Sequence, residues 1–191
     1  MRTDLGRPRN QLIDDAVLTA TVELIGEIPY AELSVDAIAR RARTSKPAIY
    51  RRWPSKAHLV HEAVFPIGES TEIPSTGSLP DDIREMVRRV AGVLSAPPAR
   101  AALPGLIGEM AADPTLHTAL LTRFGDIITR GLGDFLAGAA DRGEIRSEVT
   151  ADELAEAVTG IALVSLLARG TALDDGWMDR AATLILRGIR A

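Results

Sequence analysis

The sequence predicts an all-α protein. Apolar residues recur at steps of three and four along most of the chain, and neither an alternating strand pattern nor an internal repeat appears. Hydrophobic residues make up 46% of the 191 residues but aromatic residues only 4%, so the core consists mainly of Leu, Ile, Val and Ala, which suits helices. A chain of this length and composition fits one large or two small domains with a sizeable core.

The first helix is predicted over residues 10–25, after an N-terminal arm. The arm, residues 1–8, carries arginines beside Gly6 and Pro8; such arms reach into a minor groove or along a phosphate backbone, and a frayed, solvated terminus is the alternative. Gly26 and Pro29 end the helix. Its apolar face is expected to cover the segment that follows and consists of Leu12, Ile13, Ala16, Val17, Ala20 and Leu24.

Residues 33–60 contain two short helical patterns, a tight break between them and the start of a third helix. Ser34 can cap the first helix and Ser45 the second, where Pro47 stands in the first turn and its missing N–H is not needed. Ile49 and Trp53 are four residues apart, so they share a face that packs on the first helix. Two helices joined by a short turn, the second short and basic, are typical of a helix-turn-helix, which places its second helix in the major groove of DNA.

Charge is distributed unevenly along the chain. The net charge is −4, but residues 1–60 hold ten Lys and Arg against seven Asp and Glu, whereas residues 61–191 hold twelve against nineteen. Seven of the basic residues lie between Asp36 and Glu62 with no acidic residue among them. Only the face that contacts DNA has to neutralise phosphates, so an acidic remainder is compatible with DNA binding. A solvated charged face is the alternative, and the helix-turn-helix spacing argues against it.

From Ile38 to Leu59 the sequence resembles the DNA-binding signature of the tetracycline-repressor (TetR) family of transcriptional regulators. The matching residues, at fixed offsets, are Ile38-Ala39, Ala42, Ser45-Lys46, Ile49-Tyr50, Trp53, Pro54-Ser55-Lys56 and Leu59. The sequence departs from the family at three places: Arg43 stands where the family has a turn glycine, Thr44 replaces the usual Val, and Pro47-Ala48 replaces a Gly-Thr pair. A left-handed Arg43 costs roughly 1 kcal/mol.

The candidate DNA-contacting residues share the recognition helix and its flanks. Tyr50 follows the buried Ile49 and so points away from the core, and arginine is the side chain best shaped to grip guanine edges or phosphates. Lys56 matches the phosphate-binding lysine of the family. For Ser34 and Ser45 capping is the stronger expectation, and Trp53 is expected in the core. The full set is Ser34, Thr44, Ser45, Lys46, Ala48, Tyr50, Arg51, Arg52 and Lys56.

The rest of the chain predicts further helices. They span residues 57–65, 79–94, 100–112, 116–140, 154–169 and 177–189, with a loop over residues 66–78. Pro97-Pro98 is expected to end one helix and Pro104 to interrupt the next, while Asp113-Pro114 and a capping box over residues 150–153 start the two that follow. We expect a DNA-binding domain over residues 1–60 and an effector-binding and dimerisation domain over residues 61–191.

The predicted helix over residues 154–169 is apolar on more than one face, so it needs more than one neighbour. In so short a chain a second copy is a plausible neighbour. We therefore expect a homodimer through the two C-terminal helices, which form an antiparallel pair that meets its symmetry mate. An ordinary internal helix is the alternative. A dimer also suits a helix-turn-helix, which reads paired half-sites about 34–36 Å apart.

The resemblance to the family implies a repressor of palindromic double-stranded operator DNA that a small-molecule effector releases. The effector cavity is expected among the helices of residues 79–170, and its apolar candidates indicate a hydrophobic effector. Each candidate also fits a core position, and for His117 a surface place is the stronger expectation. The candidates are Met86, Met110, His117, Leu121, Phe124 and Ile128.

Other functions find little support. The chain has no cysteine, no signal peptide and no apolar stretch long enough for a membrane span, which fits a cytoplasmic protein. His58 and His61 lie three apart beside Glu62, but no third metal ligand is evident, and no catalytic motif or cofactor motif appears. We expect no enzyme, no metal and no cofactor. The alternative function is a non-specific helix-turn-helix protein without an effector.

Overall fold

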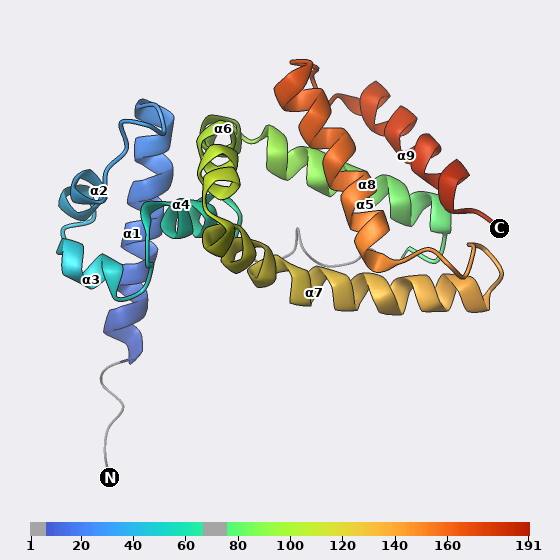
Figure 1. Ribbon diagram of the computed structural model, residues 1–191, viewed down its shortest axis with the longest axis horizontal. Coiled ribbons are helices and arrows are strands. Elements are labelled where there is room, and N and C mark those ends of the chain that lie inside the picture. Colours follow the sequence, from blue (N-terminus) through green and yellow to red (C-terminus); the bar gives the residue numbers. More distant parts are fainter. Residues whose placement is uncertain (1–6, 67–75) are drawn as a thin grey trace, which may run out of the picture. The chain divides into compact units, whose positions relative to one another are not determined.

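The computed structural model describes residues 7–66 and 76–191, except for the side chains of residues 7–10, 121 and 123–130. Within these ranges the chain is helical and has no strand, because its sole sheet-like contact is an isolated bridge between Ile145 and Arg190. The predicted all-α fold is confirmed. The helices group into two compact units, which Figure 1 draws in sequence colours and which are considered separately below.

The first unit holds the N-terminal helices together with one helix from further along the chain. Its members are α1 (Arg7–Glu27), α2 (Val35–Arg41), α3 (Lys46–Tyr50), α4 (Lys56–Val64) and α6 (Pro97–Ala112). The first helix packs against α2, α4 and α6, and α4 also packs against α6. In Figure 1, α2 and α3 lie beside α1. The helix-turn-helix therefore has α1 as its support.

The buried face of α1 differs in part from the prediction. It consists of Val17, Ala20, Thr21, Leu24 and Ile25. Leu12, Ile13 and Ala16 are exposed, so their predicted place in the core was wrong. At 3.6 residues per turn, Leu12 falls on the side of the helix away from Val17, whereas Ile13 and Ala16 lie one turn before Val17 and Ala20, where the buried face begins.

The helix α6 runs through Pro104 without a break, so the predicted interruption was wrong. It also begins at Pro97, earlier than expected, because proline is tolerated in the first turn of a helix. An internal proline removes a backbone hydrogen bond and costs about 3 kcal/mol, which tertiary packing has to offset. The packing of α6 on α1 and α4 supplies that compensation, and its buried residues are Ala99, Ala102, Leu103 and Leu106.

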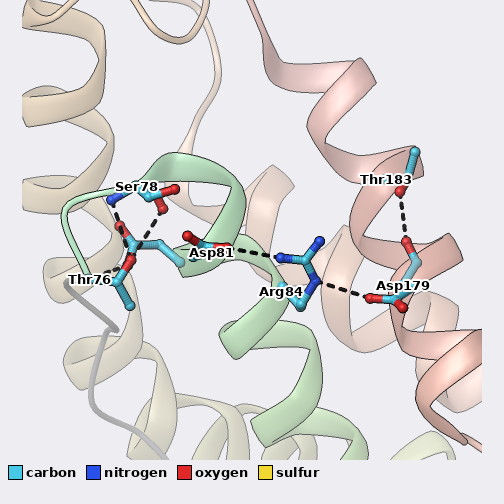
Figure 2. A network of polar contacts seen from close by, with 7 residues as sticks. Thr76, Ser78, Asp81, Arg84, Asp179 and Thr183 are labelled. Carbon is cyan, nitrogen blue, oxygen red and sulfur yellow. Dashed lines mark hydrogen bonds and ion pairs between the residues drawn. The ribbon is translucent and has the colours of Figure 1, made fainter.

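The second unit contains the C-terminal helices and one helix that precedes α6. Its members are α5 (Leu79–Ser95), α7 (Pro114–Asp141) from residue 121 onward, α8 (Ala151–Leu163), a π-helical turn (Val164–Ala168) and α9 (Asp175–Ile189). The α5 helix packs against both α8 and α9. Figure 2 shows Arg84 of α5 between Asp81, 2.9 Å away, and Asp179 of α9, 3.0 Å away.

Local signals for the helix ends in this region are confirmed. The Asp113 carboxylate accepts hydrogen bonds from the N–H groups of Thr115 and Leu116 at 2.9 and 3.1 Å and so caps α7. At α8, Thr150 and Glu153 exchange the two bonds of a capping box, at 3.2 and 2.9 Å. These contacts lie within three residues, which is why the sequence reveals them.

The end of the predicted helix over residues 154–169 is a π-helical turn, which the periodicity did not indicate. The indole N–H of Trp177 on α9 donates to the Ser165 hydroxyl at 3.1 Å, and both side chains are buried. Val164 and Leu167 of the same turn are exposed in the single chain. The helix thus buries one apolar face inside the unit and leaves apolar residues of another face uncovered.

The contacts assign the segment up to residue 66 and residues 97–120 to the first unit. The division of function that we expect at residue 60 stays a prediction. Of the predicted N-terminal arm, residues 1–6 lie outside the described residues, as do residues 67–75 of the predicted loop. Among the described residues no single helix is long and apolar enough to cross a membrane, and only α5 and α6 taken together reach that length and composition.

Candidate nucleic-acid interface

The turn between α2 and α3 is closed by backbone hydrogen bonds at the end of α2. The N–H of Thr44 donates to the Ala39 carbonyl at 2.9 Å, and the N–H of Arg43 donates to the Arg40 carbonyl at 3.3 Å. This pair of bonds is a Schellman motif, whose central residue takes the left-handed conformation. That residue is Arg43, with φ of 52°. The sequence therefore places a strained arginine where a glycine is favoured.

Serines start the helices of this segment. The Ser34 hydroxyl accepts from the Ala37 N–H at 3.2 Å, and the Ser45 hydroxyl accepts from the Ala48 N–H at 3.3 Å. Pro47 stands in the first turn of α3, as predicted. Both serines therefore act as caps in the described structure, and a contact of either with phosphate stays a prediction.

The buried side of α3 is anchored by two residues, as the spacing predicted. Ile49 and Trp53 are 1% and 4% exposed. The indole N–H of Trp53 also donates to the Glu62 carboxylate of α4 at 3.0 Å. This packing fixes the rotation of α3 about its axis. Trp53 belongs to the core and does not face the solvent.

The opposite side of α3 presents polar and basic side chains to solvent. Tyr50 is 44% exposed, and Lys46, Arg51 and Arg52 are exposed as well. Ala48 and Thr44 are half-buried. The structure thus brings most of the predicted DNA-contacting residues onto one short helix and its borders. A surface with a phenol and three cations can bind phosphates and the hydrogen-bonding edges of bases.

Two of these cations are paired with carboxylates of the same chain. The Lys46 ammonium lies 2.7 Å from the Asp36 carboxylate of α2, and this hydrogen bond raises the pKa of Lys46. The guanidinium of Arg52 pairs with Asp14 of α1. Neither Asp36 nor Asp14 was expected beside these cations. No local signal reveals such pairs, because the partners lie 10 and 38 residues apart.

Lys56, the predicted phosphate ligand, is held inside the first unit. Its ammonium donates to the Tyr30 carbonyl at 3.1 Å, lies 4.0 Å from the centre of the Tyr30 ring and is 3.5 Å from the Glu109 carboxylate of α6. Burial, and then the neighbouring Glu109, raise the pKa of the Tyr30 hydroxyl. An ammonium group has three donors, and these partners within the first unit compete with a phosphate for them. Neither Tyr30 nor Glu109 was expected near this lysine.

The predicted effector residues are distributed over both units. Met86 is buried in the second unit, and in the first Met110 is half-buried and His117 exposed, which agrees with the surface place favoured for His117. The side chains of Leu121, Phe124 and Ile128 lie outside those that the structure describes. Their role in effector binding stays a prediction.

The first unit also has a shallow, open depression of about 460 Å³ that includes none of the predicted effector residues. It is lined by the segment from Ile25 to Ala31, which comprises the end of α1 and the residues after it, and by Ala101, Pro104 and Gly105 of α6. Tyr30 forms part of the wall. The depression is open to solvent and mainly apolar.

The histidine pair of α4 does not form part of a larger cluster in the described structure. The Nδ1 atom of His58 lies 2.9 Å from the Ser55 hydroxyl, and the buried His61 ring lies 5.5 Å from the ring of Phe65. In residues 7–66 and 76–191, no three His, Cys, Asp or Glu side chains gather in a way that could hold a metal ion.

Two protein-family models match the chain. Residues 17–63 match the model described as bacterial regulatory proteins, tetR family, and residues 73–185 match the tetracyclin repressor-like C-terminal domain. The first match covers the helix-turn-helix described above. The second extends over more than half of the chain.

Individual relatives agree with these matches. The DNA-binding transcriptional repressor TetR of Mycobacteroides abscessus is 32% identical over 190 residues, which cover 93% of this chain and 94% of the relative. An uncharacterized HTH-type transcriptional regulator of Mycobacterium tuberculosis is 38% identical over 148 residues, 75% of this chain and 71% of the relative.

Solved structures share the fold. GusR of Salmonella enterica superimposes with a TM-score of 0.68 at 20% identity, over 96% of this chain and 97% of GusR. A TetR transcriptional regulator from Agrobacterium tumefaciens also gives 0.68, at 22% identity, over 94% and 95% of the two chains. At these identities the likeness concerns the fold alone.

Proposed function

Because this chain belongs to the TetR family of helix-turn-helix transcriptional regulators, we propose that it is a repressor which a small hydrophobic effector releases from its operator. The observation that carries the DNA-reading part is the exposed face of α3, where Tyr50 and Arg51 stand opposite the buried Ile49. The repressor part is supported by the similarity to a relative that bears that name.

The contacts of the recognition surface follow from its chemistry. Arg51 carries a planar donor pair that matches the two acceptors on a guanine edge in the major groove, and Tyr50 offers a hydroxyl to base or phosphate. Lys46 and Arg52 join them from the two ends of α3. Lys56 binds a backbone phosphate, and the half-buried Thr44 and Ala48 border the contact. Ser34 and Ser45, the N-caps of α2 and α3, lie beside the phosphates in the proposed complex.

The protein acts as a homodimer through α8 and α9. TetR-family regulators dimerise, and the exposed apolar residues of this chain support the choice of these helices. Val164 and Leu167 are exposed on the π-helical turn after α8, and Leu184 of α9 is 63% exposed. A two-fold dimer presents two copies of α3 to a palindromic operator with half-sites about 34–36 Å apart.

The effector acts by stabilising a dimer state with unsuitable spacing of the two recognition helices. An effector that prefers this state by about 3 kcal/mol lowers operator affinity by roughly a hundredfold. The candidate effector-binding residues within residues 79–170 remain Met86, Met110, Leu121, Phe124 and Ile128, whereas the exposed His117 fits the surface place favoured for it. Methionine and phenylalanine suit adaptable apolar pockets, which supports a hydrophobic ligand.

The test has two steps. The wild-type protein is first used to select duplexes from a random-sequence pool in the presence of competitor DNA, and we expect a palindromic consensus. Small apolar compounds are then screened for release of that duplex in a fluorescence anisotropy assay. Enrichment of no sequence would contradict specific binding and favour a non-specific DNA-binding protein, because purely electrostatic binding does not survive competitor DNA. A consensus that no compound releases would contradict the effector.

A further inference from the structure

The recognition surface contains two carboxylates that occupy its cations in the free protein. Asp36, in the first turn of α2, holds Lys46, the first residue of α3. Asp14, on α1, holds Arg52, which follows α3. The two ion pairs therefore lie at the two ends of the short helix that is proposed to read DNA. In the described part of the chain Arg51 has no carboxylate partner, and it stands between them.

The fold does not depend on the Asp36–Lys46 pair. The side chains are 54% and 45% exposed, and an ion pair so open to solvent contributes little to stability. The helix α2 already has its cap, because Ser34 binds the Ala37 N–H. A carboxylate at an exposed place beside the proposed DNA surface nevertheless repels phosphates. Its position in the first turn of α2 favours the helix through the helix dipole but requires no partner cation, so its pairing with Lys46 calls for an explanation in terms of binding.

A cation that is already paired gains less from a phosphate than a free one. When Lys46 moves to DNA it loses Asp36, and when Arg52 moves it loses Asp14. On non-operator DNA the gain is electrostatic alone, since such binding rests on phosphate contacts and counterion release. On the operator the same side chains also meet base edges placed to receive them. The exchange of a carboxylate for a DNA contact is therefore favourable on the operator and close to neutral on non-operator DNA.

We propose that Asp36 and Asp14 are specificity-determining residues that compete with DNA for Lys46 and Arg52 and so suppress binding to non-operator sequences. The inference rests on the proposed DNA-reading role of α3 and adds to it. Arg51 is available for the first contact with any DNA. Lys46 and Arg52 leave their carboxylates and bind DNA only when the sequence offers base edges that they can contact. Asp36 provides the cleaner test, because Asp14 has a side chain that is only 15% exposed and its removal disturbs packing as well.

The experiment compares wild type with Asp36→Asn on two duplexes. One is the duplex that the wild type selects from a random pool, and the other has the same composition in shuffled order. Affinities are measured by fluorescence anisotropy from about 50 to about 200 mM salt. We expect Asp36→Asn to bind the shuffled duplex about three- to tenfold more tightly, with a slope of log affinity against log salt steeper by about one. The selected duplex gains less than about twofold, so the specificity ratio falls.

Two further variants control for charge and chemistry. Asp81 also stands in the first turn of a helix, is 59% exposed and pairs with an arginine, but it belongs to α5 of the other unit. Asp81→Asn removes the same charge and should leave both affinities and both slopes as in wild type. Asp36→Glu keeps the carboxylate and should retain the wild-type ratio. The unfolding midpoint of each variant is measured in parallel, because an unfolded basic segment also binds DNA without sequence preference.

The outcomes are distinct. Unchanged binding of the shuffled duplex by Asp36→Asn, or an equal gain on both duplexes, would overturn the inference. A similar gain for Asp81→Asn would do so as well, because the effect would then be one of net charge. If the wild type selects no duplex, the proposed function fails instead, and a duplex of arbitrary sequence, compared between wild type and Asp36→Asn in the same salt series, still decides whether Asp36 competes with phosphate.

Discussion

The ammonium group of Lys56 lies 4.0 Å from the centre of the Tyr30 ring and donates a hydrogen bond to the Tyr30 carbonyl at 3.1 Å. Glu109 of α6 completes this arrangement at 3.5 Å. One side chain thus connects the start of α4, the segment between α1 and α2, and α6. All three belong to the first unit. Lys56 therefore stabilises the first unit when no DNA is bound.

Replacement of this lysine is expected to affect both stability and DNA binding. Lys56→Ala removes a cation–π contact and a partly buried ion pair, and should lower the free energy of unfolding by about 1 kcal/mol. It also removes a proposed phosphate contact, so the salt slope of DNA binding should flatten by about one. Denaturant unfolding and a salt series measure the two effects. Lys56→Arg, which keeps the charge and can stack on the ring, is the control. An unchanged slope would refute the phosphate contact.

The turn at Arg43 stores strain that a glycine would relieve. Its φ of 52° lies in the left-handed region, where a residue with a Cβ atom pays roughly 1 kcal/mol. Arg43→Gly should therefore raise the unfolding midpoint by about 2–4 °C. Arg43→Ala removes the same charge but keeps the Cβ atom, and should show no such gain. Equal midpoints for the two variants would mean that the strain is not relieved at this position.

Gly105 of α6 allows the close approach of Tyr30. A Cβ atom at this position would lie 2.1 Å from Cδ1 of the Tyr30 ring. Gly105→Ala should thus destabilise the first unit by about 1–3 kcal/mol in denaturant unfolding. Gly108, in the same helix, has open space within 4 Å of the place that a Cβ atom would take, so Gly108→Ala should be neutral or stabilise by about 0.5–1 kcal/mol. A tolerated Gly105→Ala would show that α6 moves freely against Tyr30.

The exposed apolar residue Leu184 of α9 tests the proposed dimer. A charge at this position would be buried between the two copies, so Leu184→Asp should give a monomer by light scattering at micromolar concentration. Leu12 is a matched control, since it is 68% exposed against 63% for Leu184 but lies on α1. Leu12→Asp should remain a dimer. If Leu184→Asp also remained a dimer, α9 would not supply the interface that we propose.

Features that depend on neighbouring residues could be predicted from the sequence. The caps at Ser34, Ser45 and Thr150 are examples, because donor and acceptor lie three residues apart. The buried Ile49 and the exposed Tyr50 follow from helical periodicity in the same way. Together these signals were sufficient for the fold class and for the exposed face of α3.

Features that depend on distant residues could not be predicted. Asp14 and Arg52 are 38 residues apart, and Lys56 meets Tyr30 across 26. Pro104 was expected to interrupt α6. This expectation was wrong because helix propensity takes no account of the packing of α6 on α1 and α4. The π-helical turn around Ser165, whose hydroxyl accepts a hydrogen bond from Trp177, likewise has no local pattern that predicts it.

The central claim is that the exposed face of α3 reads the operator. It is tested most directly by the affinity of Arg51→Ala and Tyr50→Ala for the selected duplex, with dimer mass and unfolding midpoint checked in parallel. A base contact or a well-placed phosphate contact accounts for about 1–3 kcal/mol, so each variant should bind the duplex about ten- to a hundredfold more weakly while it remains a folded dimer. Arg100→Ala, which removes an exposed arginine of α6, should bind like the wild type. Wild-type operator affinity in both Arg51→Ala and Tyr50→Ala would contradict the claim.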